Sequence, residues 1–487
     1  LYMRNELVKE FDPLVNDANW SERRRIANEK ATELASKDEN AISEFVDRAL
    51  EFFGDANKLA NIYSIAYALG QMAPEKDCIT THLKNAFKKP GDDPHFVFAT
   101  YIAGSWVYAL RERKEDALSV LKMLYELPAS AEEKVPFIRE AYRPYYSDNY
   151  KLISDEEVTF LISAYDAFKS ADKLVEYLQI IGWTFTYNWE DYKRVVGAVL
   201  NDMNASEIEN GFKTLANSIY HGVRQLIDDN KKELIPDNIG EWLLDLMLEM
   251  PMPDVVGDVT LPHIEMILDH SSRPSIKWLV DALNYRLTLV GEGETEKSRV
   301  IPLRLHLSKY VQPINSHDLS NDAARKDIEA LLGFIDNKGW LGYVLPEYLF
   351  DVDPDGLLIP DIVKERLDGF QSKDADAVWK WSRIAGQYPM NSDAWRKMAI
   401  SACRFADRAD EKTRLDIFVS LIERKIEGWS SSPGEVPPHF YEKVEKARQM
   451  LESETDVFLK SFWEWNHENA QSELQHHIEI AKEMSEE

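Results

Sequence analysis

The sequence is poor in cysteine and has no long apolar run. Only two cysteines, Cys78 and Cys403, occur among 487 residues, which excludes a disulfide framework and is typical of proteins from the reducing cytoplasm. No stretch approaches the roughly 18 apolar residues that a membrane-spanning helix needs, and no charged start precedes an apolar segment as in a signal peptide. We therefore expect a cytoplasmic protein without a membrane partner.

Positive charge is scarce. The 57 Lys and Arg residues stand against 85 Asp and Glu residues, which gives a net charge of −28. Because an acidic surface repels phosphate backbones at long range, nucleic acid is not an expected partner. The same charge can steer a basic protein toward the chain. An acidic decoy for nucleic-acid-binding proteins remains an open alternative.

The motifs of nucleotide-binding and hydrolytic enzymes are missing. Neither GxxxxGK[ST] nor GxGxxG after a strand occurs, which removes the common phosphate-binding signatures. His467 and Glu468 begin an HExxH-like segment, but Gln471 stands where the second zinc-binding histidine is needed. Ser432 replaces the last glycine of a GxSxG elbow at 428–432. We therefore predict no enzyme activity, no cofactor, and no catalytic or metal-binding residue.

Apolar residues recur at helical spacing along most of the chain. The segment 154–170 does so and opens with a capping box formed by Ser154 and Glu157. In 413–426 the apolar positions follow i, i+3, i+4, i+7 and i+11, which forms one stripe on a helix and fits no strand: Leu415, Phe418, Val419, Ile422 and Ile426. Such helices come in pairs. Because one pair alone exposes too much apolar surface, we predict an all-α fold of stacked antiparallel helix pairs.

The helix pairing resembles a degenerate HEAT-like α-solenoid. It is most similar to the C-terminal arms of large bacterial signalling and defence NTPases. That resemblance implies a non-enzymatic scaffold or sensor module, which would bind a protein partner or its own N-terminal domain. The chain opens at Leu1 without a methionine and ends in "IAKEMSEE", so we expect the C-terminal part of a larger multidomain protein.

Clusters of proline and glycine, which interrupt helices, predict the domain boundaries. They occur in the middle of the chain and in its last third, and we place boundaries near residues 150, 300 and 430. We predict four parts, namely N-terminal helical repeats over 1–150, middle repeats over 151–300, C-terminal repeats over 301–430, and a terminal helical cap over 431–487.

The acidic segment "DVDPDGLLIPDI" at 351–362 partly matches a calcium-binding EF-hand loop. Aspartates at positions 1, 3 and 5 and glycine at position 6 fit the pattern: Asp351, Asp353, Asp355 and Gly356. Ile362 takes the place of the bidentate glutamate at position 12, which removes two oxygen ligands. We predict a turn between helices, with a positive φ at the glycine. A weak cation site at 351–356 remains the alternative.

Thirteen tryptophans are a heavy load for a helical chain. Trp379 with Trp381, and Trp463 with Trp465, stand two residues apart, and residues at this spacing do not share a helix face. One of each pair therefore cannot face the core. Exposed tryptophan anchors many interfaces, so these four are candidate interface residues; the alternative is that they fill gaps between irregular helix pairs. A further aromatic cluster lies in "GWTFTYNW" at 182–189.

A second function remains open, from a different class of protein. An all-α enzyme could hold a divalent cation through paired carboxylates, since hard cations prefer oxygen ligands. The acidic excess and the aspartate pairs at 92–93 and 228–229 motivate this alternative.

Overall fold

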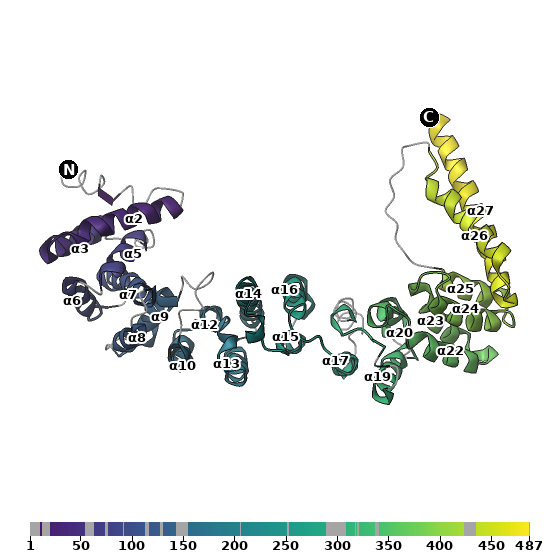
Figure 1. Cartoon of the computed structure of the whole chain (residues 1–487), viewed down its shortest axis with the longest axis horizontal. Helices are drawn as coiled ribbons and strands as arrows, with labels where there is room; N and C mark the ends of the chain where they lie inside the picture. The colour runs from purple at the N-terminus through teal and green to yellow at the C-terminus, as the bar shows by residue number, and fades with distance from the viewer. Residues whose placement is uncertain are drawn as a thin grey trace. The chain divides into compact units, whose positions relative to one another are not determined.

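In the computed structural model the following residues are described: 10–11, 20–53, 63–73, 76–90, 92–112, 116–126, 130–142, 154–204, 206–250, 253–288, 308–316, 318, 321–336, 340–422 and 435–486. All regular structure in these ranges is helical, and they contain no strand (Figure 1). The predicted all-α fold is confirmed. No helix within these ranges combines the length and the hydropathy that crossing a bilayer needs.

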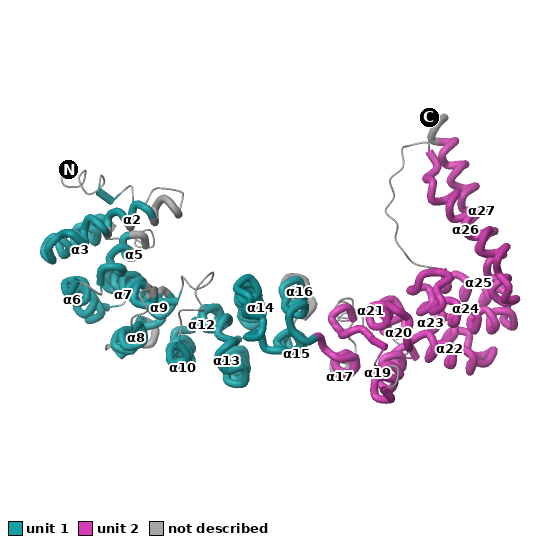
Figure 2. Tube along the Cα trace, in the orientation of Figure 1, with its two compact units in different colours: residues 1–272 teal, residues 273–487 magenta. Residues whose placement is uncertain are grey.

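The chain divides into two compact units, Leu1–Ser272 and Arg273–Glu487 (Figure 2). The boundaries that the sequence predicts near 150, 300 and 430 fall outside the described residues, as does the GxSxG-like segment 428–432.

The first unit is built from helices and short 3-10 turns in chain order. They are α2 (Trp20–Ala35), α3 (Glu39–Phe53), α5 (Tyr63–Met72), α6 (Asp77–Ala86), α7 (Pro94–Glu112), α8 (Ala117–Tyr125), α9 (Ala131–Tyr142), α10 (Asp155–Ser163), α11 (Tyr165–Ser170), α12 (Leu174–Ile181), η5 (Thr184–Thr186), α13 (Trp189–Asp202), α14 (Ile208–Asp228), η6 (Lys232–Leu234), α15 (Ile239–Glu249) and α16 (Pro253–Leu268).

The helices of the first unit pack on elements that lie close to them in the chain. α7 packs on α5 and on α9, while α14 packs on α12 and on α16. The centre of α7 is apolar and buried, with Phe98, Ile102 and Val107 fully enclosed. Burial of such faces removes apolar surface from water and holds neighbouring helices together.

The predicted capping box is present at the start of α10. The backbone N–H of Glu157 donates to Oγ of Ser154 at 3.3 Å, and the N–H of Ser154 donates to Oε2 of Glu157 at 3.4 Å. Two of the backbone donors that every helix start leaves free are thereby satisfied. The predicted single helix is interrupted at Ala164, where α10 ends and α11 begins.

The second unit continues with elements of the same kind. They are α17 (Ile276–Thr288), η7 (Ser308–Tyr310), α19 (Asp322–Gly333), η9 (Phe334–Asp336), α20 (Trp340–Val344), η10 (Leu345–Tyr348), α21 (Leu349–Val352), α22 (Ile359–Gly369), η11 (Ser372–Asp374), α23 (Ala375–Ser382), η12 (Ala385–Gln387), α24 (Asp393–Ala406), α25 (Glu411–Leu421), α26 (Pro438–Ser453) and α27 (Val457–Glu486).

Helix α24 is the centre of the second unit's packing. It contacts α22, α25 and α27, and α26 packs along α27. Trp395 on α24 is fully buried and donates its Nε1 proton to the backbone oxygen of Leu421 at 2.9 Å. Its ring lies 5.7 Å from the ring of Trp463 on α27. One aromatic side chain thus joins three helices.

The helix that the sequence predicts at 413–426 is present in part as α25, which ends at Leu421. Residues 423–426, with the predicted stripe member Ile426, lie outside the described residues. The buried face of α25 differs from the predicted stripe. Ile417, Phe418 and Leu421 are buried, whereas Val419 is 53% exposed. The contacts with α23 and α24 therefore select a face that lies partly beside the predicted one.

Candidate functional site

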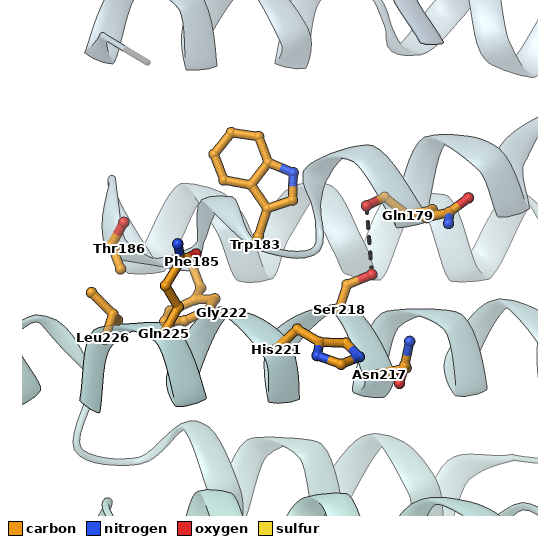
Figure 3. Close-up of a pocket in the computed structure, with 10 residues that line it drawn as sticks. All are labelled: Gln179, Trp183, Phe185, Thr186, Asn217, Ser218, His221, Gly222, Gln225 and Leu226. Carbon is orange, nitrogen blue, oxygen red and sulfur yellow. Dashed lines mark hydrogen bonds between the residues drawn. The ribbon is translucent and has the colours of Figure 1, made fainter. Parts of the chain in front are cut away.

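A cavity of about 210 Å³ lies in the first unit, between α12 with η5 on one side and α14 on the other (Figure 3). The two walls come from segments about 40 residues apart in the chain. They are tied together where the hydroxyl of Ser218 donates to the backbone oxygen of Gln179 at 3.5 Å (Figure 3). We call this cavity and the polar side chains along its rim the α14 groove.

The inner part of the α14 groove is mainly apolar. Phe185 and Leu226 are each 1% exposed, and Trp183 is 8% exposed. Nε1 of Trp183 is buried and finds no acceptor among the described residues. Figure 3 shows the indole of Trp183 directed away from α14, so this side chain offers the cavity no hydrogen-bond donor.

Two glycines allow the walls of the groove to approach each other. A Cβ atom on Gly222 would lie 2.8 Å from a ring carbon of Phe185, and one on Gly182 would lie 2.5 Å from Cβ of Ser218. Both distances are shorter than van der Waals contact between carbon atoms. Any larger residue at either position would push α12, η5 and α14 apart.

The rim of the α14 groove carries polar side chains, namely carboxamides and one imidazole. Asn217, His221 and Gln225 follow one another on α14 at i, i+4 and i+8, and therefore lie on one face of that helix. Gln179 contributes a further carboxamide from α12. Asn217, His221 and Gln179 are exposed, and Gln225 is half-buried. The residues that line the cavity include no Asp, Glu, Lys or Arg.

The four tryptophans predicted as interface residues all lie in the second unit, and the structure separates them by burial. Trp381 is 4% exposed and Trp463 is 1% exposed, whereas Trp379 and Trp465 are half-buried. In each pair one ring is therefore enclosed and the other partly accessible. The interface role stays a prediction, and Trp379 and Trp465 are the members that present surface for it.

Trp381 lines an open groove of about 390 Å³ between α19 and α22. Its Nε1 donates to Asp336 at 2.9 Å, and Arg366 donates to the same carboxylate at 2.7 Å. The Arg366 guanidinium also lies 5.6 Å from the centre of the Trp381 ring. These polar groups are paired with one another, so they stabilise the contact between η9, α22 and α23.

The predicted turn is present between α21 and α22; it begins at Asp353, since Asp351 and Val352 belong to α21, and Gly356 has a φ of +63°. Asp353 is fully buried, and its carboxylate accepts the backbone N–H groups of Leu357, Leu358 and Ile359 at 2.8, 2.9 and 2.8 Å. The side chain at the third position of the EF-hand pattern therefore caps the start of α22 and points into the protein. These bonds occupy both carboxylate oxygens of Asp353.

The other candidate metal-binding residues are scattered. Asp93 accepts the backbone N–H of His95 at 2.8 Å and lies 3.7 Å from Lys89, and Asp228 is the last residue of α14. His467 and Glu468 lie within α27. In the part of the chain that the structure describes, no three His, Cys, Asp or Glu side chains are placed to hold a metal ion together.

A second cavity in the first unit, of about 200 Å³, is lined by Asp47, Cys78 and His82. Burial, and next the nearby His95, lower the pKa of His82 from 6.5 to about 4. Burial also raises the pKa of the Cys78 thiol. His82 is therefore neutral and Cys78 protonated at pH 7, which makes this cavity uncharged apart from Asp47.

No protein-family model matches this chain, and no curated protein matches it significantly. The geometry of the described residues is therefore the basis for assigning a function.

Proposed function

We propose that the chain is a non-enzymatic protein-interaction module of the cytoplasm. In this proposal its helices form a HEAT-like α-solenoid that acts as a scaffold or sensor arm. It binds a protein partner, or an N-terminal domain of the larger bacterial signalling or defence protein to which it belongs.

The observation that carries this proposal is the packing of helices on near neighbours in the chain. α7 lies between α5 and α9, α14 between α12 and α16, and α24 between α22 and α25. In a repeat array each element buries its apolar face against adjacent elements, and the core lengthens with the chain. Such arrays use their extended surfaces to bind other proteins.

The α14 groove supports a binding function over a catalytic one. Its lining offers carboxamides, hydroxyls and one imidazole around an apolar interior, without a carboxylate or an ammonium group. Hydrogen-bonding groups around apolar surface suit recognition. General acid–base or metal-assisted catalysis calls instead for titratable groups with shifted pKa values or for ligands gathered at one point.

Small-angle X-ray scattering of the whole chain tests the proposed array. A compact globule of 487 residues has a radius of gyration of about 23 Å. We expect a clearly larger radius, with an asymmetric distribution of interatomic distances. A radius near 23 Å with a symmetric distribution would contradict the solenoid.

A display library of protein fragments from the source genome tests the interaction function. We expect overlapping clones of the same fragments to be enriched on the immobilised chain, and the purified fragments to bind it in solution. If repeated selections enrich fragment clones no more on the immobilised chain than on the empty support, the proposed interaction function is contradicted. A thermal shift with Mg²⁺ or Mn²⁺ that disappears in Asp92→Asn/Asp93→Asn would instead favour the divalent-cation enzyme.

A further inference from the structure

We propose that the α14 groove binds an extended segment of the partner protein by its main chain, with one uncharged partner side chain inserted over Phe185 and Leu226. This inference rests on the proposed function, and it assigns that function a site and a chemical class of ligand.

The spacing of the rim residues matches an extended peptide. A helix rises 1.5 Å per residue, so Asn217, His221 and Gln225 are about 6 Å apart along α14. An extended chain advances about 6.6 Å for every two residues. Three successive rim side chains can therefore meet alternate residues of a segment that runs along the helix.

The chemistry of the rim matches a main chain. Each carboxamide carries both a donor and an acceptor, and imidazole offers one of each when neutral. A peptide main chain presents one N–H and one C=O per residue, and both need partners when they leave water. The hydrogen-bonding groups of Gln179 and Asn217 can supply those partners from opposite walls of the groove.

The absence of Asp, Glu, Lys and Arg from the cavity lining selects a partner side chain without charge at the anchor position. The charged residues Arg224 and Asp228 lie exposed on α14 outside the cavity. The chain as a whole carries a net charge of −28, yet the residues around this cavity include no Asp, Glu, Lys or Arg. A charged partner group placed here would lose water without gaining a counter-charge, which is unfavourable. The net negative charge of the chain attracts basic partners in general. Binding at the α14 groove does not depend on that attraction.

The size of the cavity indicates a part of a larger ligand. Pockets that enclose whole small molecules measure roughly 300–1,000 Å³, and this cavity measures about 210 Å³. One side chain of a partner fits such a space, as interface anchors do in well-packed pockets. The exposed rim then contacts the residues on either side of the anchor.

The experiment selects peptides from a phage-displayed library of random 12-residue sequences on the full chain. Their affinities are then measured by fluorescence anisotropy. We expect enriched peptides without charge in their central residues. Asn217→Ala and Gln225→Ala should each weaken binding about three- to tenfold, the worth of one hydrogen bond. Asn210→Ala, at an exposed position of α14 outside the groove, is the matched control and should leave affinity unchanged.

Two further variants separate main-chain recognition from other modes. Selected peptides that are N-methylated at alternate residues should bind at least about tenfold more weakly, because methylation removes main-chain donors. Gln225→Glu introduces charge and should weaken the same peptides. Equal affinity of methylated and unmethylated peptides would overturn the inference. An affinity that is the same for the wild type and for the rim variants would also overturn it. So would binding of free mono- or disaccharides that Asn217→Ala abolishes.

The two sets of binding experiments distinguish a wrong binding site from a wrong interaction function. If genomic fragments bind the chain and the rim variants do not affect them, the interaction function stands and the α14 groove is not its site. If no fragment binds, the proposed protein-interaction function is wrong. Circular dichroism and urea unfolding of each variant check that the fold is intact, which is expected because alanine favours helices at exposed positions.

Discussion

Arg111 on α7 and Glu157 on α10 form a buried ion pair across 46 residues of sequence. Their side chains are 1% and 4% exposed. Nε of Arg111 donates to Oε1 of Glu157 at 2.8 Å, and Nη1 donates to the backbone oxygen of Ala141 at 2.8 Å. The guanidinium also lies 4.5 Å from the ring of Tyr142. Charge, hydrogen bonding and ring contact thus join α7, α9 and α10.

Glu157→Gln keeps the size of the side chain and the backbone bond from the N–H of Glu157 to Oγ of Ser154. It removes the charge and replaces one of the two acceptor oxygens, which bind Arg111 and the N–H of Ser154, by a donor. Because the Arg111 guanidinium then stays buried without its counter-charge, we expect the free energy of unfolding to fall by about 3–5 kcal/mol. The matched control is Glu176→Gln, which affects a more exposed pair with Arg139 and should cost below about 1 kcal/mol. Urea unfolding followed by circular dichroism measures both. Equal losses would contradict the role of burial.

Asp353 stabilises the turn before α22 through three backbone N–H groups. Asp353→Ala leaves these donors buried without an acceptor, so we expect a loss of about 3 kcal/mol in the free energy of unfolding. Asp355→Ala changes an exposed residue of the same turn and should shift stability by less than about 0.5 kcal/mol. If the two variants were equally stable, the carboxylate would not be acting as a cap.

The tryptophan pair on α27 separates core packing from surface contact. Trp463→Ala should lower the free energy of unfolding by about 3–5 kcal/mol, because the ring is enclosed. Trp465 is half-buried against Phe418, at 5.5 Å between ring centres. Trp465→Ala should cost less than half as much, and it should weaken partner binding if the predicted interface role holds. A large loss of stability with unchanged binding would assign Trp465 to the core.

His82 makes the stability of the first unit depend on pH. Its pKa is about 4 in the folded chain, below the ordinary value of 6.5, because of burial and of His95; Asp47 opposes this shift and Lys89 adds to it. Below pH 6.5 the unfolded chain takes up the proton more readily than the folded chain does. The stabilisation is therefore complete above pH 6.5 and is lost as the pH falls toward 4, by up to about 3 kcal/mol.

Unfolding free energies measured between pH 4 and 7 test this dependence. His82→Gln should flatten the curve, while His476→Gln, at an exposed position of α27, should leave its slope unchanged. A wild-type curve that is flat from pH 7 to pH 4.5 would show that His82 is not buried in its neutral form.

Helical periodicity predicted the fold class because burial on one face of a helix leaves a direct pattern in the sequence. It predicted the face of α25 less well, since the exposure of Val419 and the burial of Ile417 depend on which helices pack there. The turn at 351–356 could be predicted because proline restricts the local backbone conformation and glycine permits a positive φ. The burial of the Asp353 carboxylate could not be predicted, since its hydrogen-bond partners are backbone N–H groups, which do not depend on residue type.

The α14 groove could be predicted only in part. The sequence showed the aromatic cluster at 182–189, which contains Trp183 and Phe185, but no pattern joined it to Asn217, His221 and Gln225. The two segments meet because Gly182 and Gly222 permit close approach of their helices. Such long-range proximity is a property of packing, and a single sequence does not contain it.

The most direct test of the central claim, that this chain binds a protein segment without transforming it, is a titration. A fragment recovered from the genomic display is labelled and titrated with the full chain, and its mass is measured before and after incubation. We expect saturable binding by anisotropy, one fragment per chain, and an unchanged fragment mass. Binding that never saturates, or a fragment that is cleaved or modified by the chain, would contradict it.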